Sequence, residues 1–132
     1  RFYRQQTNGE WEEVAGKNPT ITEKGKDLFV SWPLQDGSAI FNLDFKADRT
    51  DISCQAKAQK FNWMLQLRVQ PQAELPFTSI SARQITARQD GFLYKINLTK
   101  GIFQDLRNQG NGKVFSIQPT GNKITLFLNT TK

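Results

Sequence analysis

Apolar and polar side chains alternate through one stretch in the middle of the chain. All five odd positions from Phe61 to Val69 are apolar, whereas three of the four even positions are polar. Successive side chains of a β-strand point to opposite faces, so this alternation is typical of a strand that buries one face. We predict a strand over Phe61–Val69 that lies centrally in a sheet.

A second alternating stretch opens a pattern of strand, helix and hairpin. Every second residue of Phe92–Leu98 is apolar, which predicts another strand. Thr99 can cap a helix with its hydroxyl. Three apolar residues then follow at spacings that place them on one helical face: Ile102, Phe103 and Leu106. We therefore predict one short α-helix near residues 100–109, ended by Gly110.

Two pairs of apolar runs, each interrupted by turn residues, predict β-hairpins. In the first pair, Asp27–Leu34 and Ser38–Lys46 are separated by Gln35, Asp36 and Gly37. The Asp-Gly dipeptide supplies the positive backbone angles that a tight turn requires. In the second pair, Val114–Gln118 and Lys123–Asn129 flank a loop of sequence Pro-Thr-Gly-Asn, a composition suited to a turn.

The length of the chain and the spacing of these runs predict the fold class. A chain of 132 residues fits a single domain, 1–132, and can bury a core without a metal or a disulfide. Strands at short intervals favour an antiparallel β-sandwich or barrel over alternating βαβ units. We predict a mainly β fold of about seven or eight strands with one short α-helix. Residues 1–26 are expected to form a loosely packed N-terminal segment.

Charge is distributed unevenly along the chain. Residues 1–51 carry seven Lys or Arg against nine Asp or Glu, whereas residues 52–132 carry eleven against three. The net charge is therefore −2 in the first part and +8 in the second. A basic bias favours an anionic partner, such as nucleic acid, an acidic glycan, an anionic membrane or an acidic protein surface. Basic residues spread over solvated strand faces are the alternative interpretation.

The composition excludes the commonest catalytic arrangements. The chain has no histidine and one cysteine, Cys54, so Ser-His-Asp and Cys-His sites cannot form. We expect Cys54 to be a small buried strand residue, and we expect no cofactor, no metal site and no enzymatic activity. Paired carboxylates leave a glycosidase open as an alternative. The candidate carboxylates are Glu10, Glu12, Glu13, Asp44, Asp48 and Asp51.

Cations of the second part of the chain are the candidate partner contacts. We predict that four of them bind the partner: Arg68, Arg83, Arg88 and Lys95. Strand parity places Arg68 and Lys95 on the faces of their strands that point away from the apolar residues Trp63 and Tyr94. The preferred hypothesis is a non-catalytic binding module that recognises an acidic surface of another protein, in an adaptor, inhibitor, immunity or envelope accessory role.

Two alternative functions would use the aromatic residues. A single-stranded nucleic-acid-binding β-barrel would stack bases on Trp63 and Tyr94 and follow the phosphates with Lys and Arg. The parity of both residues disfavours this function, because it predicts that they fill the core. A carbohydrate-binding module would present Trp11 and Trp32 as flat apolar surfaces for sugar rings, since both lie near predicted loops or strand ends.

Few features of the sequence bear on location. No apolar run approaches the ~18 residues that span a bilayer, so we expect a soluble domain without a membrane span. The chain begins with Arg1 rather than methionine, as a processed product or a trimmed chain would. Together with the β-rich, histidine-free and cysteine-poor composition, this favours an extracytoplasmic location, periplasmic or secreted. A cytoplasmic location is the alternative.

Overall fold

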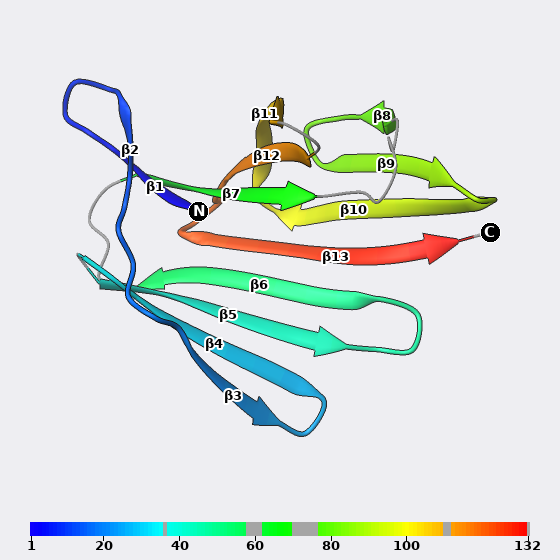
Figure 1. The fold of residues 1–132 in the computed structure, drawn as a ribbon, viewed down its shortest axis with the longest axis horizontal. Helices are drawn as coiled ribbons and strands as arrows, with labels where there is room; N and C mark the ends of the chain where they lie inside the picture. The colour runs from blue at the N-terminus through cyan, green and yellow to red at the C-terminus, as the bar shows by residue number, and fades with distance from the viewer. Residues whose placement is uncertain (36, 58–61, 70–76, 110–111, 132) are drawn as a thin grey trace.

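The chain folds into two antiparallel β-sheets (Figure 1). The structure is a computed structural model that describes residues 1–35, 37–57, 62–69, 77–109 and 112–131. Within these ranges there are thirteen strands, and the two sheets contain five and eight of them. The predicted mainly β, antiparallel fold is therefore confirmed, whereas the predicted number of strands is too low.

The smaller sheet, sheet A, has the strand order β11-β12-β7-β1-β2. Its strands are β1 (Phe2–Gln5), β2 (Trp11–Glu13), β7 (Trp63–Val69), β11 (Ile102–Gln109) and β12 (Gly112–Gln118). The alternating stretch forms β7, which pairs with β1 on one side and β12 on the other. Its predicted central place in a sheet is confirmed, and Phe61 lies outside the described residues.

The larger sheet, sheet B, has the strand order β3-β4-β5-β6-β13-β10-β9-β8. Its strands are β3 (Thr20–Lys24), β4 (Asp27–Leu34), β5 (Gly37–Phe45), β6 (Thr50–Lys57), β8 (Phe77–Ile80), β9 (Gln84–Gln89), β10 (Phe92–Lys100) and β13 (Lys123–Thr131). The first predicted hairpin is confirmed as β4 and β5, which pair from Asp27 opposite Asp44 to Leu34 opposite Gly37. Asp36 of its turn lies outside the described residues.

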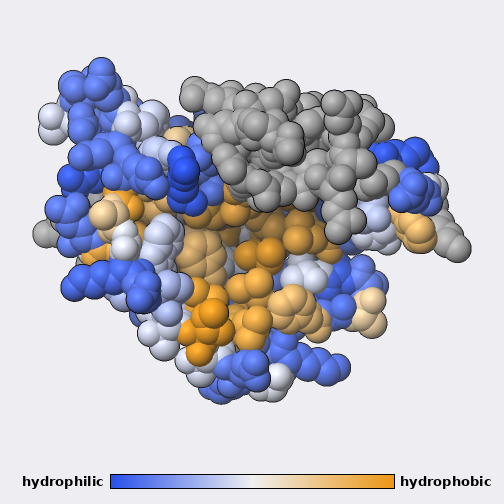
Figure 2. Space-filling view, in the orientation of Figure 1, coloured by the Kyte–Doolittle hydropathy of each residue, from blue (hydrophilic) through white to orange (hydrophobic). Residues whose placement is uncertain are grey.

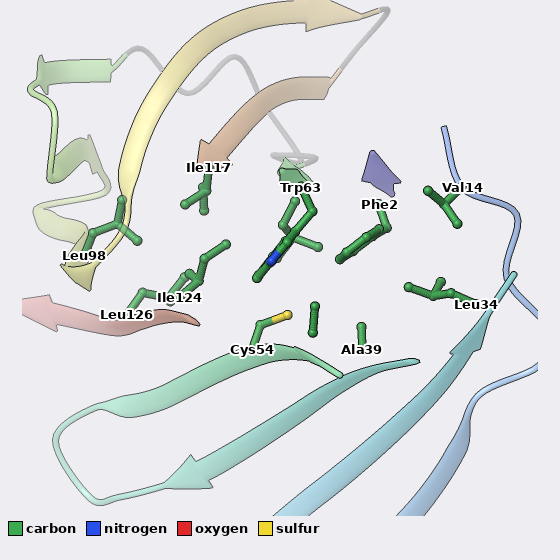
Figure 3. Packing of buried hydrophobic residues seen from close by; sticks show 12 residues of the cluster. Phe2, Val14, Leu34, Ala39, Cys54, Trp63, Leu98, Ile117, Ile124 and Leu126 are labelled. Atoms are coloured by element: carbon green, nitrogen blue, oxygen red, sulfur yellow. The ribbon is translucent and has the colours of Figure 1, made fainter. Parts of the chain in front are cut away.

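The hydrophobic core lies where sheet A packs on one end of sheet B (Figure 3). Sheet A contributes Phe2 and Trp63, whose rings stack with their centroids 5.1 Å apart. The main buried residues of sheet B are Ala39, Cys54, Ala56, Leu98, Ile124 and Leu126. From the N-terminal segment, Phe2 and Val14 are buried in this core, whereas residues 15–26 are exposed.

Residues 100–109 form a strand, so the predicted short α-helix is wrong. After β10 the chain bends at Gly101, which has a φ of 115°, and continues as β11 in the other sheet. A Cβ atom at Gly101 would lie 3.0 Å from the carbonyl oxygen of Gln118, so the crossing requires glycine.

A β-bulge explains the helix-like spacing in this segment. Phe103 lies opposite Ile117, and Leu106 lies opposite Phe115, with a register shift between Phe103 and Asp105. Because of the extra residue in the bulge, Ile117 and Phe115, which are only two apart and share one face of β12, lie opposite two residues that are three apart in the sequence. This spacing is the same as that of neighbours on one helical face.

The second predicted hairpin has the expected turn, but its two strands separate. Thr120 and Lys123 exchange backbone hydrogen bonds of 3.0 and 3.2 Å around Gly121 and Asn122, which have φ values of 59° and 62°. These positive angles fit a two-residue turn. However, β12 then joins sheet A and β13 joins sheet B, so the hairpin prediction is wrong beyond the turn.

Asn122 connects the two sheets at this crossing. The indole Nε1 of Trp63 in sheet A donates a hydrogen bond of 2.5 Å to Asn122 Oδ1. Asn122 Nδ2 donates a second hydrogen bond of 2.8 Å to the carbonyl oxygen of Ala56 in sheet B. One amide side chain therefore satisfies the buried tryptophan and fixes the end of β6.

Three aspartates lie side by side on the face of sheet B that points away from sheet A, which we call the outer face. Asp27, Asp44 and Asp51 occupy paired positions of β4, β5 and β6, and we call them the acidic row. Lys46 Nζ lies 2.6 Å from Asp51 Oδ2 and 3.9 Å from Asp44 Oδ2, and Arg49 Nε lies 3.0 Å from Asp51 Oδ1. The two cations therefore neutralise one end of the row.

The pKa values of the two aspartates at the ends of the acidic row shift in opposite directions. Desolvation and, after it, the neighbouring charge of Asp44 raise the pKa of Asp27. The hydrogen bond from Lys46 is the main cause that lowers the pKa of Asp51, and it outweighs desolvation. The ionised form is thus disfavoured at Asp27 and favoured at Asp51.

Replacing Asn122 should loosen the connection between the sheets. We expect Asn122→Gly, which preserves the positive φ, to lower the free energy of unfolding by about 1–3 kcal/mol, because the Trp63 indole loses its acceptor. Asn122→Ala should cost more, since alanine adds backbone strain. Urea denaturation measures both changes. An Asn122→Gly variant as stable as the parent chain would contradict this role.

Neutralising the ends of the acidic row should have opposite effects. The pKa of Asp27 is raised in the folded chain, so the folded state favours the protonated carboxyl. As the pH rises through that pKa the carboxyl ionises and destabilises the fold, so Asp27→Asn should raise the urea midpoint at neutral pH. Because the folded pKa of Asp51 is lowered, its contribution is lost as the pH falls, so Asp51→Asn should lower the midpoint at neutral pH. Both differences should shrink in acid, and shifts of the same sign at neutral pH would refute the assignment.

Candidate binding surfaces

The structure brings three of the four predicted cations to one hairpin. Arg88 in β9 lies opposite Leu93, and Lys95 lies two residues further along β10, so both belong to the outer face of sheet B. Arg83 directly precedes β9. Arg68 belongs to β7 of sheet A, where its backbone lies opposite Val114, and it does not join the other three.

These three cations are available to a partner. Arg83 and Arg88 are exposed, and Lys95 is half-buried. Within the described residues, none of the three forms a salt bridge, in contrast to Arg1, Arg4, Lys46 and Arg49. No side chain in the described part of the chain therefore neutralises their charges.

A chain of amides supports the surface beside these cations. Gln84 Nε2 in β9 donates a hydrogen bond of 2.6 Å to Asn97 Oδ1 in β10. Asn97 Nδ2 then donates a bond of 3.1 Å to Asn129 Oδ1 in β13. Asn129 lies opposite Lys95, so the amides cross three strands and hold the outer face in a fixed arrangement around the cation.

The opposite face of sheet B, which we call the inner face, is apolar and only partly covered by sheet A. Side-chain exposure rises along β13 from 1% at Ile124 to 38% at Leu128. It rises along β10 from 5% at Leu98 to 41% at Tyr94. Figure 2 shows the resulting hydrophobic area over β4, β5, β6 and β13.

Five of the six exposed large apolar side chains in the described residues belong to this inner face. The register places Phe45 opposite Thr50 and Thr50 opposite Leu128, so all three share one face. The five exposed residues are Ile21, Phe45, Phe92, Tyr94 and Leu128. The inner face of sheet B is thus covered at the end where the core lies and exposed to solvent at the other end, which we call the open end.

The prediction that Trp63 and Tyr94 both fill the core is correct only for Trp63. Trp63 is 2% exposed, whereas Tyr94 lies on the apolar side of its sheet but is 41% exposed. Parity assigns a residue to a face, and it does not show how far the second sheet extends. Neither residue therefore shares a surface with the cations of β9 and β10.

The candidate nucleophile is buried in the core, and several of the candidate carboxylates are paired with other side chains. Cys54 is buried in β6, as predicted, and desolvation raises the pKa of its thiol to about 12, so the thiol is protonated at neutral pH. Among the candidate carboxylates, Glu12 binds Arg4 at 3.2 Å, and Asp44 and Asp51 belong to the acidic row. Hydrogen bonds, first from Gln6 and then from Arg4, lower the pKa of Glu12.

The two tryptophans proposed for sugar binding have different environments. Trp32 packs against the core, and the backbone of Gly16 lies directly on its ring, where any Cβ atom would collide. Trp11 instead lines an open pocket of about 170 Å³ at the end of sheet A. The other lining residues are Gln5, Asn62, Trp63, Gln118 and Pro119. Sequence reasoning missed these polar residues because they come from separate segments.

The part of the chain that the structure describes contains no group of three or more His, Cys, Asp or Glu residues that could hold a metal ion. In the same part, no helix has the length and the apolar character needed to cross a membrane. The sequence matches no protein-family model and no curated protein.

Proposed function

We propose that the chain is a non-catalytic binding module that recognises an acidic surface of another protein through the hairpin of β9 and β10. One observation supports this proposal above all. The hairpin gathers Arg83, Arg88 and Lys95, none of which forms a salt bridge within the described residues, and it exposes Phe92 and Tyr94 on its other face.

The residue types of the hairpin favour a protein as the partner. Arginine and large aromatic side chains contribute most of the binding energy in many protein interfaces. The planar guanidinium groups of Arg83 and Arg88 can each form two parallel hydrogen bonds with a carboxylate. An acidic protein surface offers such carboxylates to the outer face of the hairpin.

The arrangement of the hairpin does not favour single-stranded nucleic acid. Such ligands need aromatic rings beside the cations, because bases stack while their own phosphates are neutralised. Here Arg88 and Lys95 belong to the outer face of sheet B, and Tyr94 belongs to the inner face. Trp63 is buried and its indole is bound to Asn122. An extracytoplasmic location, which composition favours, is part of the proposal.

Charge reversal on the hairpin should weaken binding of an acidic ligand. The probe is a labelled peptide of Glu and Asp with interspersed Leu, and binding is followed by fluorescence anisotropy at about 0.1 M ionic strength, where the screening length is roughly 10 Å. We expect the double variant Arg88→Glu, Lys95→Glu to weaken binding about tenfold or more, because close opposite charges become like charges. Added salt should weaken binding by the parent chain.

A matched double variant controls for net charge. Lys24→Glu, Lys26→Glu introduces the same change at the exposed turn between β3 and β4. It should change the affinity less than about threefold, because salt screens charges more than roughly 10 Å away. Equal losses in the two double variants would refute a localised surface. Tighter binding of an oligothymidine than of the peptide would favour the nucleic-acid alternative instead.

A further inference from the structure

The pocket beside Trp11 is formed by three segments that meet at one end of sheet A. Gln5 at the end of β1 lies opposite Trp11 at the start of β2. Asn62 directly precedes β7, and its carbonyl oxygen accepts a hydrogen bond of 2.9 Å from the backbone N–H of Gln5. Gln118 ends β12, and Pro119 follows it. Strand pairing therefore fixes the backbone around the pocket.

The base of the pocket is rigid. Trp63 is one of its lining residues, and this side chain is buried, stacked on Phe2 and hydrogen-bonded to Asn122. Trp11, in contrast, is only half-buried, so part of its indole is accessible. The electron-rich face of an indole attracts the weakly positive C–H groups of an aliphatic ring.

The polar groups of the pocket are amides held in position. Asn62 Nδ2 donates a hydrogen bond of 3.0 Å to Gln5 Oε1, and Gln5 Nε2 donates one of 3.1 Å to the carbonyl oxygen of Gly9. Asn62 Oδ1 and the side chain of Gln118 have no hydrogen-bond partner within the described residues. Each amide offers donors and acceptors, which is the combination that vicinal hydroxyl groups require.

The charges around the pocket disfavour anionic ligands. None of its six lining residues is charged. The neighbouring residues Glu10, Glu12 and Glu13 are exposed and acidic, and Arg4 is already paired with Glu12. A phosphate or carboxylate would therefore meet repulsion without a compensating cation. A neutral ligand with hydroxyl groups fits these conditions.

From these observations we infer that the pocket beside Trp11 binds one ring of a neutral sugar, which stacks on the Trp11 indole and hydrogen-bonds to Asn62 and Gln118. Its volume of about 170 Å³ is below the range of drug-sized sites, as expected for a single ring. The pocket is open, so further sugar units can extend into solvent. This inference is independent of the proposed function of the β9–β10 hairpin.

Titration with neutral oligosaccharides tests the inference. A panel with gluco, galacto, manno and N-acetylated configurations is added to the ¹⁵N-labelled chain, and the indole resonances of Trp11, Trp32 and Trp63 are followed by NMR. We expect saturable binding of at least one sugar with the largest shift at Trp11. Trp11→Ala should weaken that binding about tenfold or more, and Trp11→Phe should retain part of it.

An exposed aromatic residue far along sheet B provides the matched control. Phe45→Ala removes a ring that is 44% exposed and should leave sugar affinity within about twofold of the parent value. Thermal unfolding checks that each variant is folded. The inference is overturned if no sugar of the panel binds at ~10 mM, a concentration that detects even weak sites. It is also overturned if adenosine binds more tightly than every sugar, or if both alanine variants lose affinity equally.

Discussion

The burial of Trp63 between the two sheets is the constraint on which the closed end of the structure depends. An indole contributes a large apolar area to a core, but its N–H must find an acceptor once water is excluded. Asn122 provides that acceptor from the turn where the chain leaves sheet A for sheet B, and it also binds the carbonyl oxygen of Ala56. The crossing of the chain and the attachment of the sheets are therefore one feature, which also fixes the base of the pocket beside Trp11.

Local alternation predicted individual strands well, because the two faces of a strand are defined by neighbouring residues alone. It identified β4, β5, β7 and β10. It failed where the chain changes sheets, since the choice of partner strand depends on distant residues. The glycine bend before β11 and the bulge at Phe103 produced a helix-like pattern in a strand. The residues of the turn between β12 and β13 likewise do not indicate that these two strands join different sheets. The local geometry of that turn was predicted correctly.

For the binding surfaces as well, the sequence predicted what neighbouring residues determine and missed what the sheet topology determines. Arg88 and Lys95 could be assigned to one surface because they belong to strands joined by a short turn. Arg68 could not be separated from them, since only the sheet topology shows that β7 belongs to sheet A. Trp11 was recognised as a candidate ring, but its amide neighbours were not. No periodic pattern connects residues from the ends of β1 and β12 with a residue before β7.

The unequal size of the sheets separates the main core from the hairpin of β9 and β10. The core occupies the end of sheet B that sheet A covers, whereas the strands at the other end carry exposed rings such as Phe45 and Tyr94. Continuous apolar areas that stay open to water are uncommon on monomeric proteins. Arg88 pairs with Leu93 near the open end, and it is not one of the residues of the core cluster. Under the proposed function, the charge of the hairpin can therefore change while the core stays the same.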